Sequence, residues 1–337
     1  MDIYSYHHFI FMRLLLPLIP CLLLFLLPLS LSYNLLPLCH QQERVALMQF
    51  KDSFIIQNNS FCEYSTEGDH LAEVASWRID GNNTNCCAWD GVECNQDTGH
   101  VIALNLQNSC LYGSITSNSS LFRLLHLQNL TLANNDFNHS QIPSEIGNLS
   151  SLTYLYLSNS NFSGQIPFEI QYLSKLSYLW LFSLDRYNLY TESLTSLVQN
   201  LTNLETLVFN GIDTSSTVPE SLANLSSLQV LYLVNCGLYG QFPTRIFHLP
   251  HLQDLYLSAN EDLTGHLPEF HTNSPLKSLF LVNTNFSGHL PASIGNLNSL
   301  TTFAIDYCNF SGTIPNSFSN LTQLTFLDLS QNSFNDL

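Results

Sequence analysis

The sequence predicts an α/β solenoid, in which similar coils stack on one another and their short strands form a parallel β-sheet. Three observations predict it. Leucines recur with constant spacing, a Phe-Ser-Gly motif follows several leucine blocks, and a small side chain recurs three positions after each block. Self-similarity at a fixed period is the signature of repeat architectures. We expect a horseshoe or superhelix with the sheet on its concave face and short helical or irregular segments on its convex face.

The leucine template is L-x-x-L-x-x-L-x-L, as in residues 149–157 and 225–233. From Leu207 to Leu327 the same position recurs every 24 residues, and one irregular unit has a step of 28 residues between Leu179 and Leu207. Each L-x-L pair fits a short strand whose leucines point inward while the residue between them faces solvent. Each coil can bury its leucines only against its neighbours. Residues 101–337 therefore form about ten leucine-rich repeats, the last of them incomplete.

The second half of the repeat contains Phe-Ser-Gly-x-Ile/Leu-Pro at 162–167, 286–291 and 310–315. Glycine permits the tight bend that turns the chain off the strand. The phenylalanine fills the core at this turn. Proline fixes the backbone where the chain enters the convex side and needs no sheet hydrogen bond.

One position in each coil must satisfy backbone groups that the turn leaves inside. The residue three positions after L-x-L is small and able to hydrogen-bond in most units: Asn135, Asn260, Asn332, Ser109, Ser160, Thr284, Cys236 and Cys308. We expect Cys236 and Cys308 to be buried and reduced, because three coils separate them. Leu184 and Ile212 do not fit this rule.

The first 32 residues are expected to be a signal peptide. Arg13 precedes an apolar run from Leu14 to Leu31, and small residues allow cleavage after Ser32. The alternative is an uncleaved anchor, which the three prolines of the run disfavour. The chain is thus expected to enter the secretory pathway, and to be extracellular or on the outer face of the plasma membrane.

Residues 33–100 are expected to form a cysteine-rich cap that closes the N-terminal end of the core. A disulfide framework in an exported chain is predicted from Cys39, Cys62, Cys86, Cys87, Cys94 and Cys110. Zinc is the alternative, but the adjacent pair Cys86-Cys87 lacks zinc-ligand spacing, so no metal is expected. Cys87 with Cys94 is the favoured local bridge; the other pairings stay open. Trp77 and Trp89 are expected in the core of the cap.

The net charge and the N-glycosylation sequons indicate the character of the protein surface. Only 10% of residues are charged and the net charge is −17, which argues against a nucleic-acid partner. Twelve N-x-S/T sequons indicate a glycosylated surface instead. They lie at Asn58, Asn82, Asn118, Asn129, Asn138, Asn148, Asn161, Asn200, Asn224, Asn285, Asn309 and Asn320.

Two stretches resemble a known family. The segments Cys86-Cys-Ala-Trp-Asp-Gly-Val-Glu-Cys94 and Thr98-Gly-His-Val-Ile-Ala-Leu-Asn-Leu106 resemble the N-terminal cap and first repeat of plant leucine-rich-repeat receptor-like proteins. The resemblance implies an extracellular solenoid that serves immune or developmental recognition and signals through partner receptor kinases. The family's membrane span does not occur in this sequence, which stops inside its tenth unit. We therefore expect a truncated product or gene fragment, with membrane attachment only through a missing C-terminal span.

A ligand is expected on the concave face, where the residues between the two leucines face solvent. The candidate binding residues are largely aromatic: Tyr154, Tyr156, Tyr178, Trp180, Phe182, Tyr232, Tyr256 and Phe280. Exposed aromatic patches often mark interaction sites. The alternative is a purely structural ladder of strand-favouring aromatics. Only Asn129 among the sequons projects from a concave strand, so we expect the glycans to leave these aromatics open.

The favoured function is therefore non-catalytic recognition of an extracellular peptide, protein or glycan, without a cofactor. The alternative is a secreted inhibitor similar to polygalacturonase-inhibiting proteins. An enzyme has little support, because no nucleophile elbow, phosphate loop or zinc-protease motif occurs, and the histidines other than His7 and His8 of the signal are scattered singly along the chain.

Overall fold

The structure is a computed structural model that describes residues 38–56, 73–79, 84–183 and 188–335. The chain divides into two compact units, Met1–Leu36 and Pro37–Leu337, and all described residues belong to the second. The expected signal peptide, Cys62, Leu184 and the sequons at Asn58 and Asn82 lie outside the described residues. The part of the chain that the structure describes contains no helix with the length and apolar composition of a membrane span.

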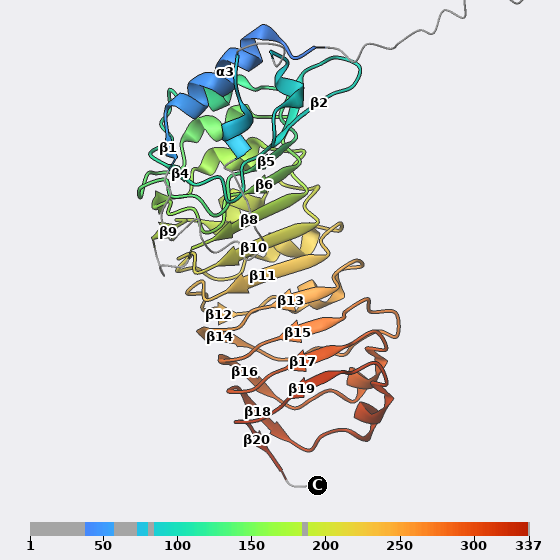
Figure 1. Cartoon of the computed structure of the whole chain (residues 1–337). Helices are drawn as coiled ribbons and strands as arrows, with labels where there is room; N and C mark the ends of the chain where they lie inside the picture. Colours follow the sequence, from blue (N-terminus) through green and yellow to red (C-terminus); the bar gives the residue numbers. More distant parts are fainter. Residues whose placement is uncertain (1–37, 57–72, 80–83, 184–187, 336–337) are drawn as a thin grey trace, which may run out of the picture. The chain divides into compact units, whose positions relative to one another are not determined.

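The second unit is built around a long sheet whose strands follow one another coil by coil (Figure 1). Successive strands pair in parallel, except that β2 is antiparallel to β3. This arrangement confirms the predicted solenoid. The eleven strands are β2 (Val92–Cys94), β3 (Val101–Asn105), β5 (Asn129–Thr131), β6 (Tyr154–Tyr156), β8 (Tyr178–Phe182), β10 (Thr206–Asn210), β11 (Val230–Val234), β13 (Asp254–Tyr256), β15 (Ser278–Phe280), β17 (Thr302–Ala304) and β19 (Phe326–Asp328).

The template leucines fill the coil interior. Leu155, Leu207 and Leu255 are fully buried, and they belong to one continuous core that runs through the described coils. Each coil is too thin to exclude water from its own leucines, so the core forms only by stacking. In the terminal coil Leu327 is 46% exposed at the same repeat position.

A second series of short strands follows the long sheet around each coil. β12 (Gly240–Gln241), β14 (Asn260–Gly265), β16 (Thr284–Gly288), β18 (Asn309–Gly312) and β20 (Ser333–Phe334) pair in that order, and β7 (Gly164–Gln165) pairs with β9 (Leu189–Tyr190). The sequence did not predict them. Their two to six residues lie at the part of the repeat that holds Phe-Ser-Gly in some coils, as in β16, where Phe286 is buried and Gly288 has a φ of 96°. Most are too short for an alternating pattern of side chains to be recognised in the sequence.

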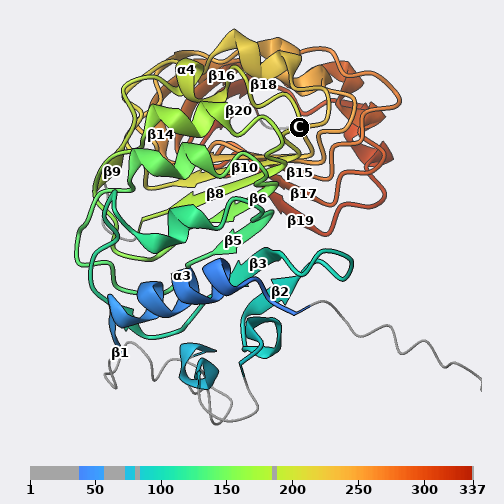
Figure 2. The ribbon, with the colours of Figure 1, turned by 90° about the horizontal axis from the view of Figure 1, so that it is seen from above.

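The remaining side of most coils is a short helical segment, although residues 266–277 contain none. Proline precedes most of these segments and lies at the N-cap, as Pro291 does for η8, because its fixed φ suits the start of a helical turn. Figure 2 looks along the stack, with the coils one behind another. The segments are η3 (Ser120–Arg123), η4 (Ser144–Asn148), η5 (Phe168–Tyr172), α4 (Leu194–Val198), η6 (Glu220–Asn224), η7 (Thr244–His248), η8 (Ala292–Asn296) and η9 (Asn316–Asn320).

The predicted small-residue position does satisfy the buried turn. Asn260 Nδ2 donates to the carbonyls of Leu233 (2.8 Å) and Leu257 (2.7 Å), and its Oδ1 accepts from the backbone N–H groups of Cys236 (3.0 Å) and Leu238 (3.1 Å). One side chain thus joins the backbone of two adjacent coils. The residue before this position has positive φ in most coils, commonly as asparagine, which tolerates the left-handed region.

Cysteine replaces asparagine in two coils. Cys236 Sγ lies 3.4 Å from the Phe209 carbonyl and Cys308 Sγ lies 3.0 Å from the Leu281 carbonyl. Both cysteines are free and buried, which confirms the expectation that they are reduced. Burial raises the pKa of the Cys236 thiol to about 12, so the group stays protonated.

The N-terminal cap consists of α3 (Gln41–Asp52), β1 (Ile55–Ile56), η1 (Glu73–Ser76) and η2 (Cys86–Ala88), with β1 antiparallel to β4 (Leu111–Tyr112). Leu47 and Phe50 of α3 are buried against the first coil. Trp77 and Trp89 are also buried and stack with ring centroids 5.6 Å apart. The tryptophans are therefore core, as expected.

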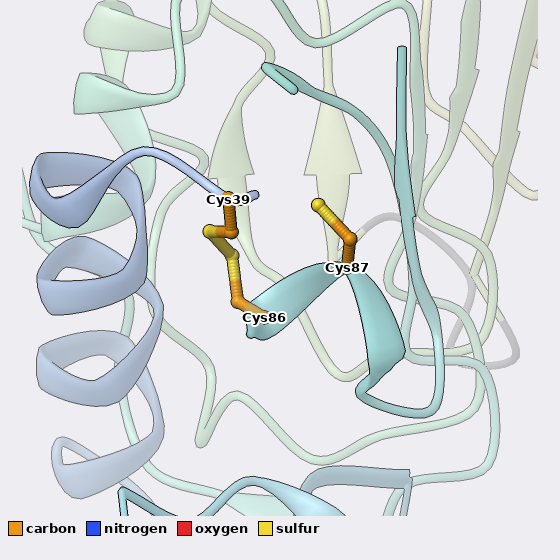
Figure 3. A group of neighbouring side chains, drawn as sticks. All are labelled: Cys39, Cys86 and Cys87. Atoms are coloured by element: carbon orange, nitrogen blue, oxygen red, sulfur yellow. A yellow bond between two sulfur atoms is a disulfide. The ribbon is translucent and has the colours of Figure 1, made fainter. Parts of the chain in front are cut away.

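Two disulfides close the described part of the cap. Cys39 pairs with Cys86 and Cys87 pairs with Cys94, each with a Cα–Cα distance of 5.4 Å. Figure 3 shows Cys86 bonded to Cys39 while the neighbouring Cys87 points elsewhere from the same helical turn. Adjacent cysteines thus serve two separate bridges rather than a metal. Cys110 is also disulfide-bonded.

Candidate ligand-binding face

The solvent side of the long sheet, called the sheet face below, carries two rows of side chains in strict register. The first row holds the residue between the template leucines, so that Tyr156 pairs with Trp180 and Tyr232 with Tyr256. The second row lies two residues earlier on each strand, where Tyr154 pairs with Tyr178. Parallel pairing without shifts places these side chains about 4.8 Å apart along the stack.

Four aromatic residues on β6 and β8 form the N-terminal aromatic cluster. Ring centroids lie 5.2 Å apart for Tyr156 and Trp180, 5.6 Å for Tyr154 and Tyr178, and 6.4 Å for Tyr154 and Tyr156. Tyr178 and Trp180 are 38% and 39% exposed. The cluster is therefore packed within itself and still open to solvent. Phe182 lies half-buried at the end of β8, in register with Asn210.

Three aromatic residues on β11, β13 and β15 form the C-terminal aromatic stack. Tyr232 and Tyr256 lie 5.0 Å apart at 30°, and Tyr256 and Phe280 lie 4.6 Å apart at 12°. All three side chains are half-buried. Phe326 on β19, which the sequence analysis did not name, lies 6.5 Å from Phe280 and is 50% exposed. The repeat could have located Phe326, because it lies two residues before Asp328 and therefore belongs to the second row.

A gap separates the two aromatic groups. Val208 on β10 lies in register between Trp180 and Tyr232, yet it is only 4% exposed. Thr206 in the second row is also buried. The expectation that Val208 is exposed to solvent was therefore wrong. Its side chain lies on the sheet face, but the larger side chains of Trp180 and Tyr232 on the neighbouring strands shield it. The aromatic surface consists of two groups.

A polar network adjoins the N-terminal aromatic cluster. Glu205 Oε2 accepts hydrogen bonds from the Tyr178 hydroxyl (3.1 Å) and from Gln229 Nε2 (3.1 Å). Gln253 Nε2 in turn donates to Gln229 Oε1 (3.4 Å). The sequence analysis missed this row, which lies directly before the strands. The hydrogen bond to Glu205 raises the pKa of Tyr178, and burial raises the pKa of Tyr154, so both phenols remain neutral near pH 7.

Acidic residues lie at the far end of the sheet face. Asp306 and Asp328 are half-buried on adjacent coils, and burial raises the pKa of Asp306. Asp328 Oδ1 accepts from the Ser330 backbone N–H (3.0 Å), and hydrogen bonds to Ser330 lower the pKa of Asp328. Asp254 and Lys277 supply further charge nearer the C-terminal aromatic stack.

The described sequon asparagines are exposed, apart from Asn161, which is half-buried. Most lie away from the sheet face: Asn148, Asn224 and Asn320 end 3-10 segments, and Asn285 and Asn309 lie in the second series of strands. Asn129 is different, because it lies on β5 in direct register with Tyr154.

Three histidines that are scattered in sequence meet at the cap. The imidazole of His100 stacks on His40 at 3.8 Å and on His126 at 3.7 Å. His100 Nδ1 lies 3.1 Å from a carboxylate oxygen of buried Glu43, whose other oxygen accepts from the Val101 backbone N–H. The sequence analysis noted only that these histidines are scattered singly along the chain, and it did not foresee that packing of the cap on the first coils brings them together.

The chain matches two families of known proteins. Residues 40–95 match the Leucine rich repeat N-terminal domain, and residues 151–173, 275–297 and 299–321 match the Leucine Rich Repeat. With its stacked coils and parallel sheet, the chain belongs to the leucine-rich-repeat proteins. Its homologues include plant receptor-like proteins. Receptor-like protein 6 of Arabidopsis thaliana is 38% identical over 277 residues, which are 79% of this chain and 28% of that protein. The chain spans about a third of the length of the curated relatives it matches.

Solved structures share the fold. The Arabidopsis receptor kinase HAESA, solved with the peptide hormone IDA and the co-receptor SERK1, has a TM-score of 0.66 and 29% identity over 88% of this chain and 50% of that chain. A plant ice-binding protein has a TM-score of 0.74 with 23% identity over 89% of both chains. The second likeness concerns the fold alone, so function must be argued from the sheet face.

Proposed function

We propose that this chain is the recognition part of an extracellular receptor-like protein and binds an extended peptide across its sheet face. The observation that carries the proposal is the pair of aromatic groups, held in register on a face that the fold leaves open. Such rings supply contact area at a low cost in conformational entropy. The proposal includes immune or developmental signalling as its setting, no catalysis, and a position outside the cell.

A peptide fits this face better than a compact protein or a glycan. Tyr232, Tyr256 and Phe280 repeat at the strand spacing, so an extended chain laid across the strands could place successive side chains against successive rings. Neighbouring carboxylates and glutamines could pair with its backbone and any basic side chain. The HAESA complex, with its peptide hormone, supports this class of ligand by similarity.

A receptor kinase is the proposed signalling partner. The HAESA complex also contains the co-receptor SERK1, and the resemblance to receptor-like proteins implies signalling through kinases. This chain would present the ligand, while a kinase would supply the enzymatic step.

The test is selection of peptides from a phage-displayed random library on the secreted protein, followed by binding measurements on variants. Tyr256→Ala should weaken binding of the selected peptides at least about tenfold, since a central aromatic anchor commonly contributes more than 1.4 kcal/mol. Tyr239→Ala is the matched control, because Tyr239 is 48% exposed and lies outside both rows. Circular dichroism would verify the fold of both variants. Equal binding to both, or no enrichment of any peptide, would contradict the proposal.

A further inference from the structure

One sequon asparagine lies on the sheet face, in register with the N-terminal aromatic cluster. Asn129 is exposed on β5 and pairs with Tyr154 on β6, which in turn pairs with Tyr178 on β8. The three residues are consecutive members of the second row. Tyr178 is thus about 10 Å from Asn129 by the usual strand spacing, within reach of the first sugars of a glycan.

We propose that an N-glycan on Asn129 packs over Tyr154 and Tyr178 and covers the N-terminal aromatic cluster. Attachment forms a bond between Asn129 Nδ2 and the anomeric carbon of an oligosaccharide. The bond from that carbon to the pyrophosphate of the lipid-linked donor breaks, and the amide loses one proton. Leu130 and Thr131 complete the sequon, and the glycan stem then leaves the sheet from the same face as the rings.

The neighbouring side chains give this glycan a preferred direction. Toward β6 and β8 it meets tyrosine rings, on which the apolar face of a pyranose can pack. Toward β3 and β2 the second row offers Ala103, which is 7% exposed, and the exposed carboxylate Glu93. Neither side chain provides a flat apolar surface. The sugar therefore gains contact by lying over Tyr154 and Tyr178.

The consequence for binding rests on the proposed function. If a glycan covers the N-terminal aromatic cluster, the peptide can bind only to the C-terminal aromatic stack of Tyr232, Tyr256 and Phe280. The buried step at Val208 marks the boundary between the two. The sequence analysis expected glycans to leave the whole aromatic surface open, and the register of Asn129 with Tyr154 argues against that for the N-terminal half.

The three tryptophans allow a test that needs no ligand. Trp77 and Trp89 are at most 2% exposed, whereas Trp180 is 39% exposed within the cluster. Quenching of tryptophan fluorescence by acrylamide therefore reports mainly on Trp180. The glycosylated protein, produced by secretion from a eukaryotic host, would be compared with Asn129→Gln, and mass spectrometry would establish occupancy at Asn129. A Trp180→Phe background defines the signal of the buried pair.

We expect Asn129 to be occupied, and its loss in Asn129→Gln to raise the quenching constant about twofold, because a bulky surface glycan no longer shields the indole. Thr131→Val should give the same increase while keeping the asparagine. Two matched controls should leave quenching unchanged: Thr131→Ser, which retains the sequon, and Asn224→Gln, which removes a glycan from the end of η6. If a variant fails to fold, enzymatic removal of glycans from the native protein replaces it.

An unoccupied Asn129 would overturn the proposal. Occupancy with equal quenching in wild type, Asn129→Gln and Thr131→Val would overturn it as well. The quenching experiment uses no peptide, so a failure of peptide binding would not affect its result. Unchanged quenching would overturn the glycan proposal alone, and the proposed function would still be tested by the peptide experiment.

Discussion

At the residue scale, one buried amide stabilises the turn in several coils more than its size suggests. Asn260 makes hydrogen bonds to four backbone groups that have no access to water. Asn135 repeats the pattern with the Leu106 and Leu132 carbonyls. A buried donor or acceptor without a partner costs the full desolvation penalty, so the position favours side chains that can hydrogen-bond.

Asn260→Ala should therefore lower the free energy of unfolding by about 3 kcal/mol, through two unpaired N–H groups and two unpaired carbonyls. Denaturant unfolding followed by circular dichroism measures the change. Asn298→Ala is the control, since Asn298 is exposed and its replacement should cost less than about 0.5 kcal/mol. Similar losses in the two variants would show that the buried amide has no special role.

The Tyr178–Glu205 contact makes a second prediction at this scale. A carboxylate beside the phenol raises the pKa of Tyr178, so above about pH 10 the folded state keeps a proton that the unfolded state has released. Stability conferred by this proton is lost as pH rises through the folded-state pKa. Glu205→Gln should move part of the tyrosinate absorbance titration to lower pH. An unchanged titration would mean that the hydrogen bond does not persist in solution.

The sequence predicted residues whose position follows from the repeat and missed those set by tertiary packing. Leucine spacing located the inward side chains, and the L-x-L rule located Tyr232 and Tyr256. It could not locate the cover over Val208, because that depends on the sizes of neighbours one coil away. Nor could it bring His40 and His126 to His100, since these contacts depend on how the start of α3 packs against the first coils.

At the element scale, the second series of strands and the helical segments determine how closely the coils approach. These strands are two to six residues long and their burial patterns differ from one strand to the next, so side-chain periodicity did not predict them. The helical segments approach most closely at glycine. A Cβ atom on Gly295 of η8 would lie 2.3 Å from the Ser317 carbonyl oxygen of η9. Gly147 of η4 faces Glu169 of η5 in the same way.

Gly295→Ala should push η8 away from η9 and destabilise the protein by about 2 kcal/mol, as overpacking does. Thermal unfolding measures the change. Ala223→Gly at the equivalent position of η6 is the control, because that coil already accommodates a Cβ and only helix propensity changes. A neutral Gly295→Ala would indicate that the coils are less tightly stacked than the structure describes.

At the scale of the whole molecule, each coil depends on both neighbours for its core. Leu255 has a coil on either side and is fully buried, whereas Leu327 occupies the same repeat position in the terminal described coil and is 46% exposed. The free energy of unfolding of such a stack is approximately the sum of the intrinsic stability of each coil and the interaction energy between neighbouring coils. The effect of one substitution should then depend on where its coil lies.

Leu255→Ala should lower the free energy of unfolding by about 3 kcal/mol through lost burial and a cavity. Leu327→Ala removes the same atoms from a half-open site and should cost less than about 1 kcal/mol. Urea titration of both variants gives the comparison. Equal losses would mean that Leu327 is covered in solution.

The stacked coils hold Tyr232, Tyr256 and Phe280 in register on the sheet face, and the binding proposal depends on their being accessible there. Hydroxyl-radical footprinting of the complex with a library-selected peptide tests it most directly. Oxidation of Tyr232, Tyr256 and Phe280 should fall in the complex, while Tyr239, outside the face, stays as reactive as in the free protein. Protection of Tyr239 with undiminished oxidation of the other three would place the ligand elsewhere and contradict the account.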